Sequence, residues 1–325
     1  MPANLPPQYY EAEKKLRETD DPAEKIEIME ELLAIMPKHK GTDHLKAELR
    51  AKIAKLTQSM GKKATVHHTK MAIPKEGAGQ VAVIGLPNSG KSQLVCSVTS
   101  ASPTVADYPF TTQTATPGMM PFENIQIQLI DTPPIAPQSF DFVFSNMLRR
   151  ADAMLIMIDL ADDPIAQMEI LLDQLQKMRV EIGKPTAEDE EGIITHKKAL
   201  IVANKIDLEN AQSKFAALQN KYEGQMPLVA ISARDKIGLE ELKLKIYQML
   251  DIIRVYTKMP GGKPDFHEPI VLDKGSTLED AAAAVHKDFL ARLKYARIWG
   301  SGKHDGVMAK RDHILQDGDI IELHV

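Results

Sequence analysis

The sequence contains little cysteine and no long apolar run, and each absence excludes a class of protein. The single cysteine, Cys96, rules out an intramolecular disulfide and a metal site built from several cysteines. No apolar run approaches the roughly 20 residues that cross a bilayer, so we expect no membrane partner. The N-terminal segment Met1–Pro7 lacks the basic start and apolar centre of an export signal. We therefore expect a cytoplasmic protein in which Cys96 is a small core residue.

The charge balance excludes a chain that binds nucleic acid over its whole surface. The net charge is -5 over 325 residues, so local basic segments have to be considered one by one. Two such segments lie near the two ends of the sequence. Changes in sequence pattern divide the chain into a helical N-terminal region at 1–75, a central region at 76–251 and a third region at 252–325.

The region 1–75 is predicted to be a helical hairpin. Apolar residues recur at helical spacing between Leu16 and Met36, and Pro22 lies near a helix start. After a break at Pro37 and Gly41, a second helix has an i, i+4 stripe made of Leu45, Leu49, Ile53 and Leu56. This second half is basic and is the first of the two local basic segments.

The region 76–251 alternates short apolar runs with helical stretches, which predicts an α/β doubly wound fold with a mostly parallel sheet. The apolar runs are uninterrupted, as in strands that are buried on both faces. The predicted strands are Val81–Ile84, Ile125–Ile130, Met154–Ile158, Ala199–Val202 and Leu228–Ile231. The predicted helices are Gln93–Ser100, Ile165–Met178, Ala211–Gln219 and Leu239–Leu250. We expect the acidic segment Val180–His196 to be an exposed loop.

The region 252–325 is predicted to be a small β-grasp module of two strands, a helix and a final strand. The strands are expected at Arg254–Tyr256, Pro269–Leu272 and Ile320–His324, with the helix at Ala281–Leu290. Thr277 or Ser276 is expected to cap this helix.

A phosphate-binding loop is predicted where the first strand of the central region ends. The segment Gly85–Ser92 matches G-x-x-x-x-G-K-[ST] and opens a helix. Its glycines let the backbone approach phosphate oxygens, and the helix N-terminus presents N–H groups to the anion. Lys91 is expected to bridge the β- and γ-phosphates, and Ser92 to ligate Mg²⁺. The predicted nucleotide contacts of this loop are Gly85, Pro87, Asn88, Ser89, Gly90, Lys91, Ser92 and Gln93.

The sequence Asn204-Lys-Ile-Asp207 predicts that the base is guanine. The Asp207 carboxylate can accept two hydrogen bonds from guanine, whereas adenine has neither donor in that position. Asn204 is expected to tie this loop to the phosphate loop, and the Lys205 stem to lie against the ring. The triplet Ser232-Ala233-Arg234 follows the next strand, and a backbone N–H there can donate to the guanine carbonyl oxygen.

Candidate magnesium ligands lie between the phosphate loop and the guanine motif. Asp131 ends the strand Ile125–Ile130 and would hold Mg²⁺ through a water molecule; the alternative is a turn-forming aspartate without a metal. A threonine of the segment Asp107–Thr112 would complete the metal shell when a γ-phosphate is present. Thr112 is favoured and Thr111 is the alternative, unless this segment is only a surface loop.

Taken together, these motifs resemble the Obg superfamily of translation-factor-class GTPases. The residues that carry the resemblance are Gly85-x-Pro-Asn-x-Gly-Lys-Ser, Asp107-Tyr-Pro-Phe-Thr-Thr and Asn204-Lys-Ile-Asp. Within that superfamily the chain is most similar to the developmentally regulated GTP-binding proteins. Its N-terminal hairpin, the absence of a glycine-rich Obg domain and a C-terminal region similar to a TGS domain, with Tyr295-Ala-Arg-Ile-Trp299, all point there.

The resemblance implies a P-loop G domain that binds GTP or GDP with Mg²⁺ and hydrolyses GTP. It implies a switch that works with the ribosome or structured RNA through the N-terminal hairpin and the TGS-like domain, with a protein cofactor as a further possible partner. In relatives, the asparagine that matches Asn88 helps to hold K⁺, so we expect potassium stimulation. The expected catalytic residues are Lys91, Thr112 and Asn88. Intrinsic turnover is expected to be slow, because no arginine or glutamine is evident for catalysis.

The sequence departs from the family pattern in two places. Pro134 replaces the glycine of Asp-x-x-Gly and has no N–H to give to a γ-phosphate, and the following Ile135 cannot orient water. The interval between Asp159 and Ala199 is too short for the insertion that eukaryotic relatives have. Partner contacts made by that insertion are therefore not expected here.

Two other functions compete with a GTPase switch. An RNA- or ribosome-binding module with a structural nucleotide is one, because the region 252–325 combines basic residues with Tyr295 and Trp299. The alternative for these side chains is a solvated helix face with Trp299 in the core. The basic residues are Lys287, Arg292, Lys294, Arg297, Lys303, Lys310 and Arg311. A small-molecule kinase is the other function, and the guanine motif disfavours it.

Overall fold

A computed structural model describes residues 7–18, 22–36, 45–46, 48–53, 73–99, 115–135, 142–183, 194–301 and 304–324. The chain divides into two compact units, Met1–Ile73 and Pro74–Val325. Within the described ranges, none of the helices combines the length and the apolar character that a membrane crossing requires.

The first unit is made of helices that share one small core. Helix α1 (Pro7–Glu18) is followed by α2 (Pro22–Ile35), and a further helical segment covers residues 48–53. Pro22 is the first residue of α2, where a missing backbone N–H costs nothing. Ala12, Leu32 and Leu49 bring all three segments into contact. The first half of the predicted hairpin is thus two helices, the second of which begins at Pro22.

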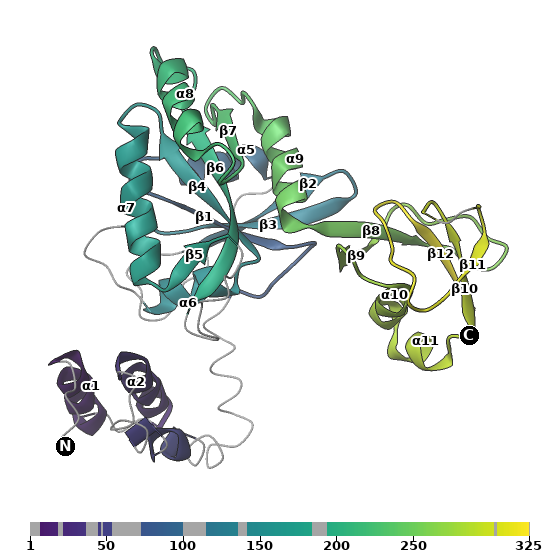
Figure 1. Cartoon of the computed structure of the whole chain (residues 1–325), viewed down its shortest axis with the longest axis horizontal. Coiled ribbons are helices and arrows are strands. Elements are labelled where there is room, and N and C mark those ends of the chain that lie inside the picture. Colours follow the sequence, from purple (N-terminus) through teal and green to yellow (C-terminus); the bar gives the residue numbers. More distant parts are fainter. Residues whose placement is uncertain are drawn as a thin grey trace. The chain divides into compact units, whose positions relative to one another are not determined.

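The second unit is built around a central sheet of seven strands (Figure 1). The strands are β1 (Gln80–Gly85), β2 (Thr116–Phe122), β3 (Ile125–Asp131), β4 (Ala153–Asp159), β5 (Val180–Ile182), β6 (Thr195–Asn204) and β7 (Leu228–Ile231). Their order is β2-β3-β1-β4-β6-β5, and β7 also pairs with β6. Strand β2 is antiparallel to β3, and the other pairs are parallel.

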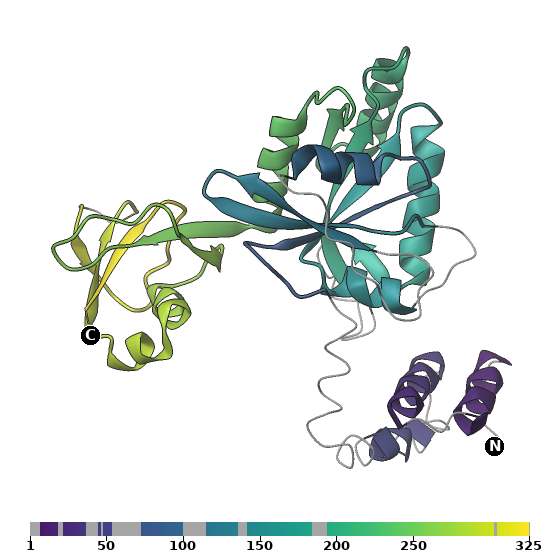
Figure 2. The same ribbon diagram turned by 180° about the vertical axis from the view of Figure 1, so that it is seen from behind.

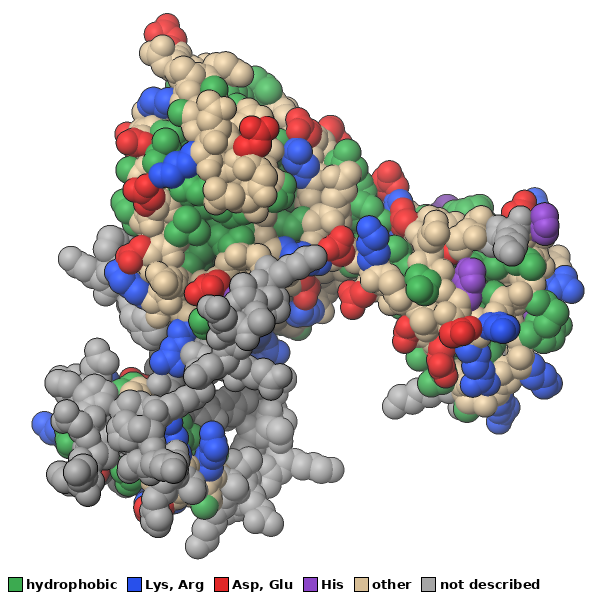
Figure 3. Space-filling view, in the orientation of Figure 1, with side chains coloured by type: hydrophobic (Ala, Val, Ile, Leu, Met, Phe, Trp, Pro, Cys, Tyr) green, Lys and Arg blue, Asp and Glu red, His purple; other side chains and the backbone are tan. Residues whose placement is uncertain are grey.

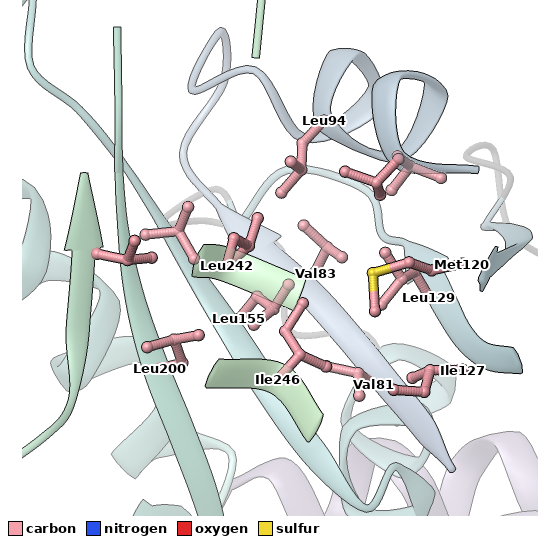
Figure 4. Packing of buried hydrophobic residues seen from close by; sticks show 14 of the residues in the cluster. Val81, Val83, Leu94, Met120, Ile127, Leu129, Leu155, Leu200, Leu242 and Ile246 are labelled. Atoms are coloured by element: carbon pink, nitrogen blue, oxygen red, sulfur yellow. The ribbon is translucent and has the colours of Figure 1, made fainter. Parts of the chain in front are cut away.

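Helices cover both faces of this sheet because alternate residues of the central strands point to opposite sides. In β1, Val81 and Val83 pack with α5 (Lys91–Val98) and α9 (Leu239–Leu250) (Figures 2 and 4). Ala82 and Ile84 pack on the other face. That face is covered by α6 (Phe142–Arg150), α7 (Pro164–Lys177) and α8 (Ala211–Tyr222). The α/β doubly wound fold predicted from the sequence is confirmed.

The five strands predicted for this region are present, but two others escaped prediction. Strand β2 is irregular in sequence because it contains Pro117, Gly118 and Pro121, which a strand at the edge of a sheet tolerates. The predicted loop Val180–His196 is wrong at both ends. Val180 is buried in β5, and β6 already begins at Thr195, since the two ends pair with each other in parallel.

A second, five-stranded sheet follows, which we call the C-terminal sheet. Its strands are β8 (Ile252–Thr257), β9 (Ile270–Asp273), β10 (Tyr295–Trp299), β11 (Val307–Ala309) and β12 (Ile320–His324). The order is β11-β10-β12-β8-β9, with β8 and β12 parallel at the centre, as in a β-grasp fold. Helix α10 (Leu278–Val285) packs on it through Leu278 and Ala281.

Three features of the region 252–325 differ from the prediction. The expected single helix is divided at His286 into α10 and α11 (Lys287–Arg292). Thr277, one of the two predicted caps, forms a capping box with Asp280. Strands β10 and β11 were both missed. In β10, charged and aromatic residues alternate with the buried Ala296 and Ile298, a pattern that by sequence alone favours a basic surface.

Arg254 connects the C-terminal sheet to the central sheet. Its guanidinium forms two hydrogen bonds with the Asp317 carboxylate, at 3.0 and 2.8 Å, and also pairs with Glu123 in the turn between β2 and β3. It lies over the ring of Tyr247, whose hydroxyl donates to Asp317 at 2.8 Å and whose ring stacks on Phe122. Burial raises the pKa of Tyr247 to about 12, so the phenol stays protonated and keeps donating.

We predict that Arg254→Ala destabilises the protein. The substitution leaves Asp317 without its bidentate partner, and losing hydrogen bonds between charged groups costs about 2 kcal/mol. Differential scanning calorimetry should show a melting temperature roughly 4–8 °C lower. Arg297→Ala, at an exposed position of β10, is the matched control and should change the melting temperature by less than about 2 °C. Equal shifts for the two variants would contradict a connecting role for Arg254.

Candidate functional site

The predicted site residues lie at, or directly after, the carboxyl ends of strands that meet at one edge of the central sheet. Gly85 ends β1, Asp131 ends β3 and Asn204 ends β6, while Ser232 follows β7 directly. Because β1, β3, β4, β6 and β7 are parallel, these ends meet at one edge. The strand order changes direction at β1, and ligands of open α/β sheets bind at such a point.

The loop Gly85–Ser92 leads from the end of β1 into the first turn of helix α5 and contains two residues with a positive φ. Gly90 has a φ of 93° and Asn88 a φ of 61°, both in the left-handed region. A Cβ atom at Gly90 would collide with the side-chain nitrogen of Asn204. Gly90 is therefore required both for the turn and for the close approach of the guanine motif to this loop.

Lys91 points back across the loop instead of outwards. Its ammonium donates to the carbonyl oxygens of Gly85 at 3.1 Å and Leu86 at 3.0 Å. Burial lowers the pKa of Lys91, and the negative charge of Asp131 opposes that shift. The lysine thus closes the loop on itself, and its positive charge lies within the predicted phosphate loop.

Asp131 has the properties of a group that completes a metal site. Its Oδ1 atom is buried and has no hydrogen-bond partner among the described residues. Burial raises the pKa of Asp131, while a hydrogen bond with Ser92 and the charge of Lys91 lower it. The described residues contain no cluster of three His, Cys, Asp or Glu. Mg²⁺ needs no such cluster, because substrate phosphates and waters supply most of its ligands. Ser92 and Asp131 therefore fit Mg²⁺.

Asn204 joins the phosphate loop to the loop after β7. Its amide nitrogen donates to the Ser89 carbonyl at 2.9 Å, and its amide oxygen accepts the Ala233 N–H at 3.0 Å. The side chain is only 3% exposed, so both bonds are shielded from water. The predicted link from the guanine motif to the phosphate loop is present in the bond to Ser89, whereas the bond to Ala233 was not predicted. Ser89 is itself held by a hydrogen bond from its hydroxyl to the Leu86 carbonyl.

Lys205 is positioned by residues that the sequence analysis missed. Its ammonium pairs with Asp159, the last residue of β4, and its φ of 70° is left-handed. Asp159 is fixed in turn, because its carboxylate accepts the Ala161 N–H and its backbone exchanges hydrogen bonds with the Gln167 side chain. The sequence contained one signal for this contact, since Asp159 directly follows the predicted buried strand Met154–Ile158.

Asp207 pairs with Arg234 across the predicted base site. The Asp207 Oδ2 atom lies 2.7 Å from an Arg234 nitrogen, and the Asp207 side chain is 11% exposed. Arg234 is 71% exposed and also pairs with Asp235. The tight turn that presents Arg234 is held by Ser232, whose hydroxyl accepts the Asp235 N–H at 3.1 Å.

Some sequence-predicted residues lie elsewhere or outside the described residues. Thr111 and Thr112 are outside them. Ile135 is buried in the core beneath α6 and donates its N–H to the Gly85 carbonyl at 3.1 Å, so it is a structural residue of the loop. The expectation for Cys96 is wrong: it is exposed, because α5 buries Leu94, Val95 and Val98 on its other side.

The basic residues of the region 252–325 form a surface feature rather than a defined site. Lys and Arg side chains gather near α11 in Figure 3. Those with described, exposed side chains are Arg292, Lys294, Arg297, Lys310 and Arg311. For Trp299, the two predicted alternatives were a side chain that stacks on bases and a side chain in the core, and neither describes its position fully. It points away from the core of the C-terminal sheet but is half-buried, with the Lys258 ammonium 3.9 Å from its ring centre.

Two protein-family models match the chain. Residues 80–205 match a family described as 50S ribosome-binding GTPase, and residues 253–325 match the TGS domain. The first match contains the phosphate loop, Asp131 and Asn204. The second coincides with the C-terminal sheet.

Individual relatives extend over almost the whole chain. It is 30% identical to an uncharacterized GTP-binding protein of Methanocaldococcus jannaschii, with 92% of each chain covered. It is 29% identical to developmentally-regulated G-protein 3 of Arabidopsis thaliana, covering 92% of this chain and 98% of that one. The latter alignment runs over 362 residues, more than this chain contains, so the relative has residues that are lacking here.

A solved structure supports the fold. The YchF GTPase of Schizosaccharomyces pombe aligns with a TM-score of 0.55 at 15% identity, covering 77% of this chain and 99% of that one.

We predict that Asn204→Asp weakens the junction between the two loops. The carboxylate still accepts the Ala233 N–H, but it cannot donate to Ser89 and sets a negative charge against a carbonyl oxygen. The free energy of unfolding should fall by about 1–3 kcal/mol in urea titrations. Asn210→Asp, at an exposed left-handed position, is the control and should change it by less than about 0.5 kcal/mol. An unchanged stability of Asn204→Asp would show that the junction is not needed.

Proposed function

The chain belongs to the developmentally regulated GTP-binding proteins of the Obg superfamily, and from that premise we propose a slow, potassium-stimulated GTPase switch that associates with the ribosome or structured RNA. That it is a GTP-binding protein of the P-loop GTPases follows from the family itself. The rate, the cation and the partner are the proposed parts.

The junction at Asn204 is the observation that carries the proposal. It holds the phosphate loop and the predicted base loop in one rigid arrangement, so a nucleotide can engage both at once. Within that arrangement, we assign Asp207 to the two guanine donors and the Ala233 region to the guanine carbonyl oxygen. Lys205, fixed by Asp159, would lie along the base. Gly85, Pro87, Asn88, Ser89, Gly90 and Gln93 would surround the phosphates.

Hydrolysis would depend on positioning and charge, since phosphoryl transfer needs little covalent help from a protein. Lys91 would exchange its two carbonyl contacts for phosphate oxygens of the substrate. Ser92 and Asp131 would hold Mg²⁺, with Thr112 as a further ligand. The metal would supply positive charge beside the phosphates. Neither Ile135, which is buried, nor Pro134 can orient the attacking water.

Asn88 is the residue that we assign to K⁺. Its side chain is exposed within the phosphate loop, and its left-handed backbone conformation shows that it is not part of the helix that follows. A carboxamide oxygen there is a suitable ligand for a cation beside the phosphates. A monovalent ion would compensate for the missing arginine and glutamine, which is why we propose that potassium stimulates turnover.

A translation-linked role is supported by the family models and the surface charge. One matching family is described as ribosome-binding, and the exposed lysines and arginines near α11 suit phosphate groups. We propose that the N-terminal helices and the TGS-like part contact ribosomal or other structured RNA, with a protein cofactor as a further partner. We also retain the division at 1–75, 76–251 and 252–325, and a cytoplasmic location.

Pro134 favours a second candidate function, in which the nucleotide is structural. Without an N–H at this position, a γ-phosphate cannot form the backbone contact that glycine offers at the end of the Asp-x-x-Gly motif. Binding of RNA or ribosomes would then be the same with GDP and with a non-hydrolysable GTP analogue.

Asp207→Asn tests guanine recognition. The amide would present a donor to the donors of guanine but can pair with the C2 carbonyl of xanthine. We expect affinity for GDP to fall by about 100-fold or more and affinity for xanthosine diphosphate to rise. Calorimetric titration measures both. Asp162→Asn, on an exposed turn, should leave both affinities unchanged. Undiminished GDP binding by Asp207→Asn would refute the assignment.

GTP turnover in potassium and in sodium buffer, with and without ribosomes, tests the proposed switch. We expect potassium to raise the rate several-fold, and Asn88→Gly to abolish that difference. Glycine accepts the φ of 61° at this position, so the loop keeps its shape. Equal turnover in the two salts would refute the potassium site. No turnover under any condition, with guanine nucleotide still bound, would favour the second candidate.

A further inference from the structure

We propose that Arg234 is a displaceable counter-ion of Asp207, which holds the guanine-reading carboxylate while the base site is empty and thereby sets nucleotide affinity. This inference rests on the proposed guanine recognition by Asp207. It assigns to the Arg234 side chain a role that is distinct from the backbone contacts of its loop.

The contacts of Arg234 suit a side chain with two positions. One of its terminal nitrogens lies 2.7 Å from Asp207 Oδ2, and the same nitrogen lies 3.1 Å from Asp235 Oδ2. Its Nε atom also donates to Asp235, at 2.9 Å. Arg234 thus keeps two bonds to Asp235 even if its bond to Asp207 is broken.

Burial explains why Asp207 needs a counter-ion in the empty site. Its side chain is 11% exposed, and a carboxylate so shielded is destabilised without a hydrogen-bond donor. Arg234 supplies that donor. Guanine brings two donors of its own to the same carboxylate, so base binding replaces the Arg234 contact instead of adding to it. The arginine therefore stabilises the empty site more than the occupied one, which lowers affinity for the nucleotide.

Asp235 provides the second position. It is 41% exposed, and its backbone N–H is fixed on the hydroxyl of the fully buried Ser232. When the base takes Asp207, Arg234 remains paired with Asp235 in solvent. Without Asp235, Asp207 would be the one acidic partner of the arginine among the residues that the structure describes, and Arg234 would compete with guanine more strongly.

The test uses the full chain and compares GDP with IDP, which lacks the 2-amino group. Arg234→Ala and Arg234→Gln should each bind GDP about threefold to tenfold more tightly than the unmodified protein. Asp235→Asn should bind GDP about twofold to fivefold more weakly. Lys236→Ala removes the same charge from the same turn and serves as the control for general electrostatic attraction of the phosphates. Calorimetric titration measures the dissociation constants.

A displaceable counter-ion predicts that, relative to Lys236→Ala, the Arg234 variants bind GDP more tightly and Asp235→Asn binds GDP more weakly. Weaker GDP binding by both Arg234 variants would overturn the inference and make Arg234 a clamp on the base. Equal binding of GDP and IDP by the unmodified protein would instead refute guanine reading by Asp207. A preference for GDP without any gain in the Arg234 variants would refute only the counter-ion.

Discussion

The parallel pairing of β1 with β3 on one side and β4 on the other is the constraint on which the rest of the structure depends. It brings the carboxyl ends of neighbouring strands to one edge, so Val83 and Asp131 are paired although 48 positions separate them. It also requires both faces of the sheet to be covered, since the central strands are mostly apolar and are buried along their whole length. The parallel pairing of these strands therefore accounts both for the position of the site and for the two cores.

The residues at the end of β6 place the polar side chains of the predicted base site. Asn204 is still part of the ladder, while Lys205 turns into the left-handed region and starts the loop that carries Asp207. Each polar side chain there is fixed by a partner from another strand end: Ser89 and Ala233 for Asn204, Asp159 for Lys205. These contacts hold the geometry before any nucleotide arrives, and the hydrogen bonds of Asn204 are shielded from water.

Sequence alone predicted features that are encoded within a few consecutive residues. The loop Gly85–Ser92, the five buried strands and the Thr277 cap belong to this class. What escaped prediction depends on contacts between distant segments: β5 exists because Thr195 lies beside it, and the pairing of Lys205 with Asp159 spans 46 residues. Strand β2 was hidden by its prolines, which are tolerated here because the strand lies at the edge of the sheet. The contacts of Arg234 with both Asp207 and Asp235 likewise depend on how the turn after β7 folds, and its composition alone does not show them.

Strand β4 shows how the fold limits change of chain length during evolution. Leu155 and Met157 fill one core, while Met154, Ile156 and Ile158 fill the other. One inserted residue would turn every later side chain of the strand to the opposite face and misfill both cores together. The additional residues of the relatives must therefore have been gained, or lost here, within the connections. The connections can therefore change in length while the edge that carries Gly85 and Asn204 stays in register.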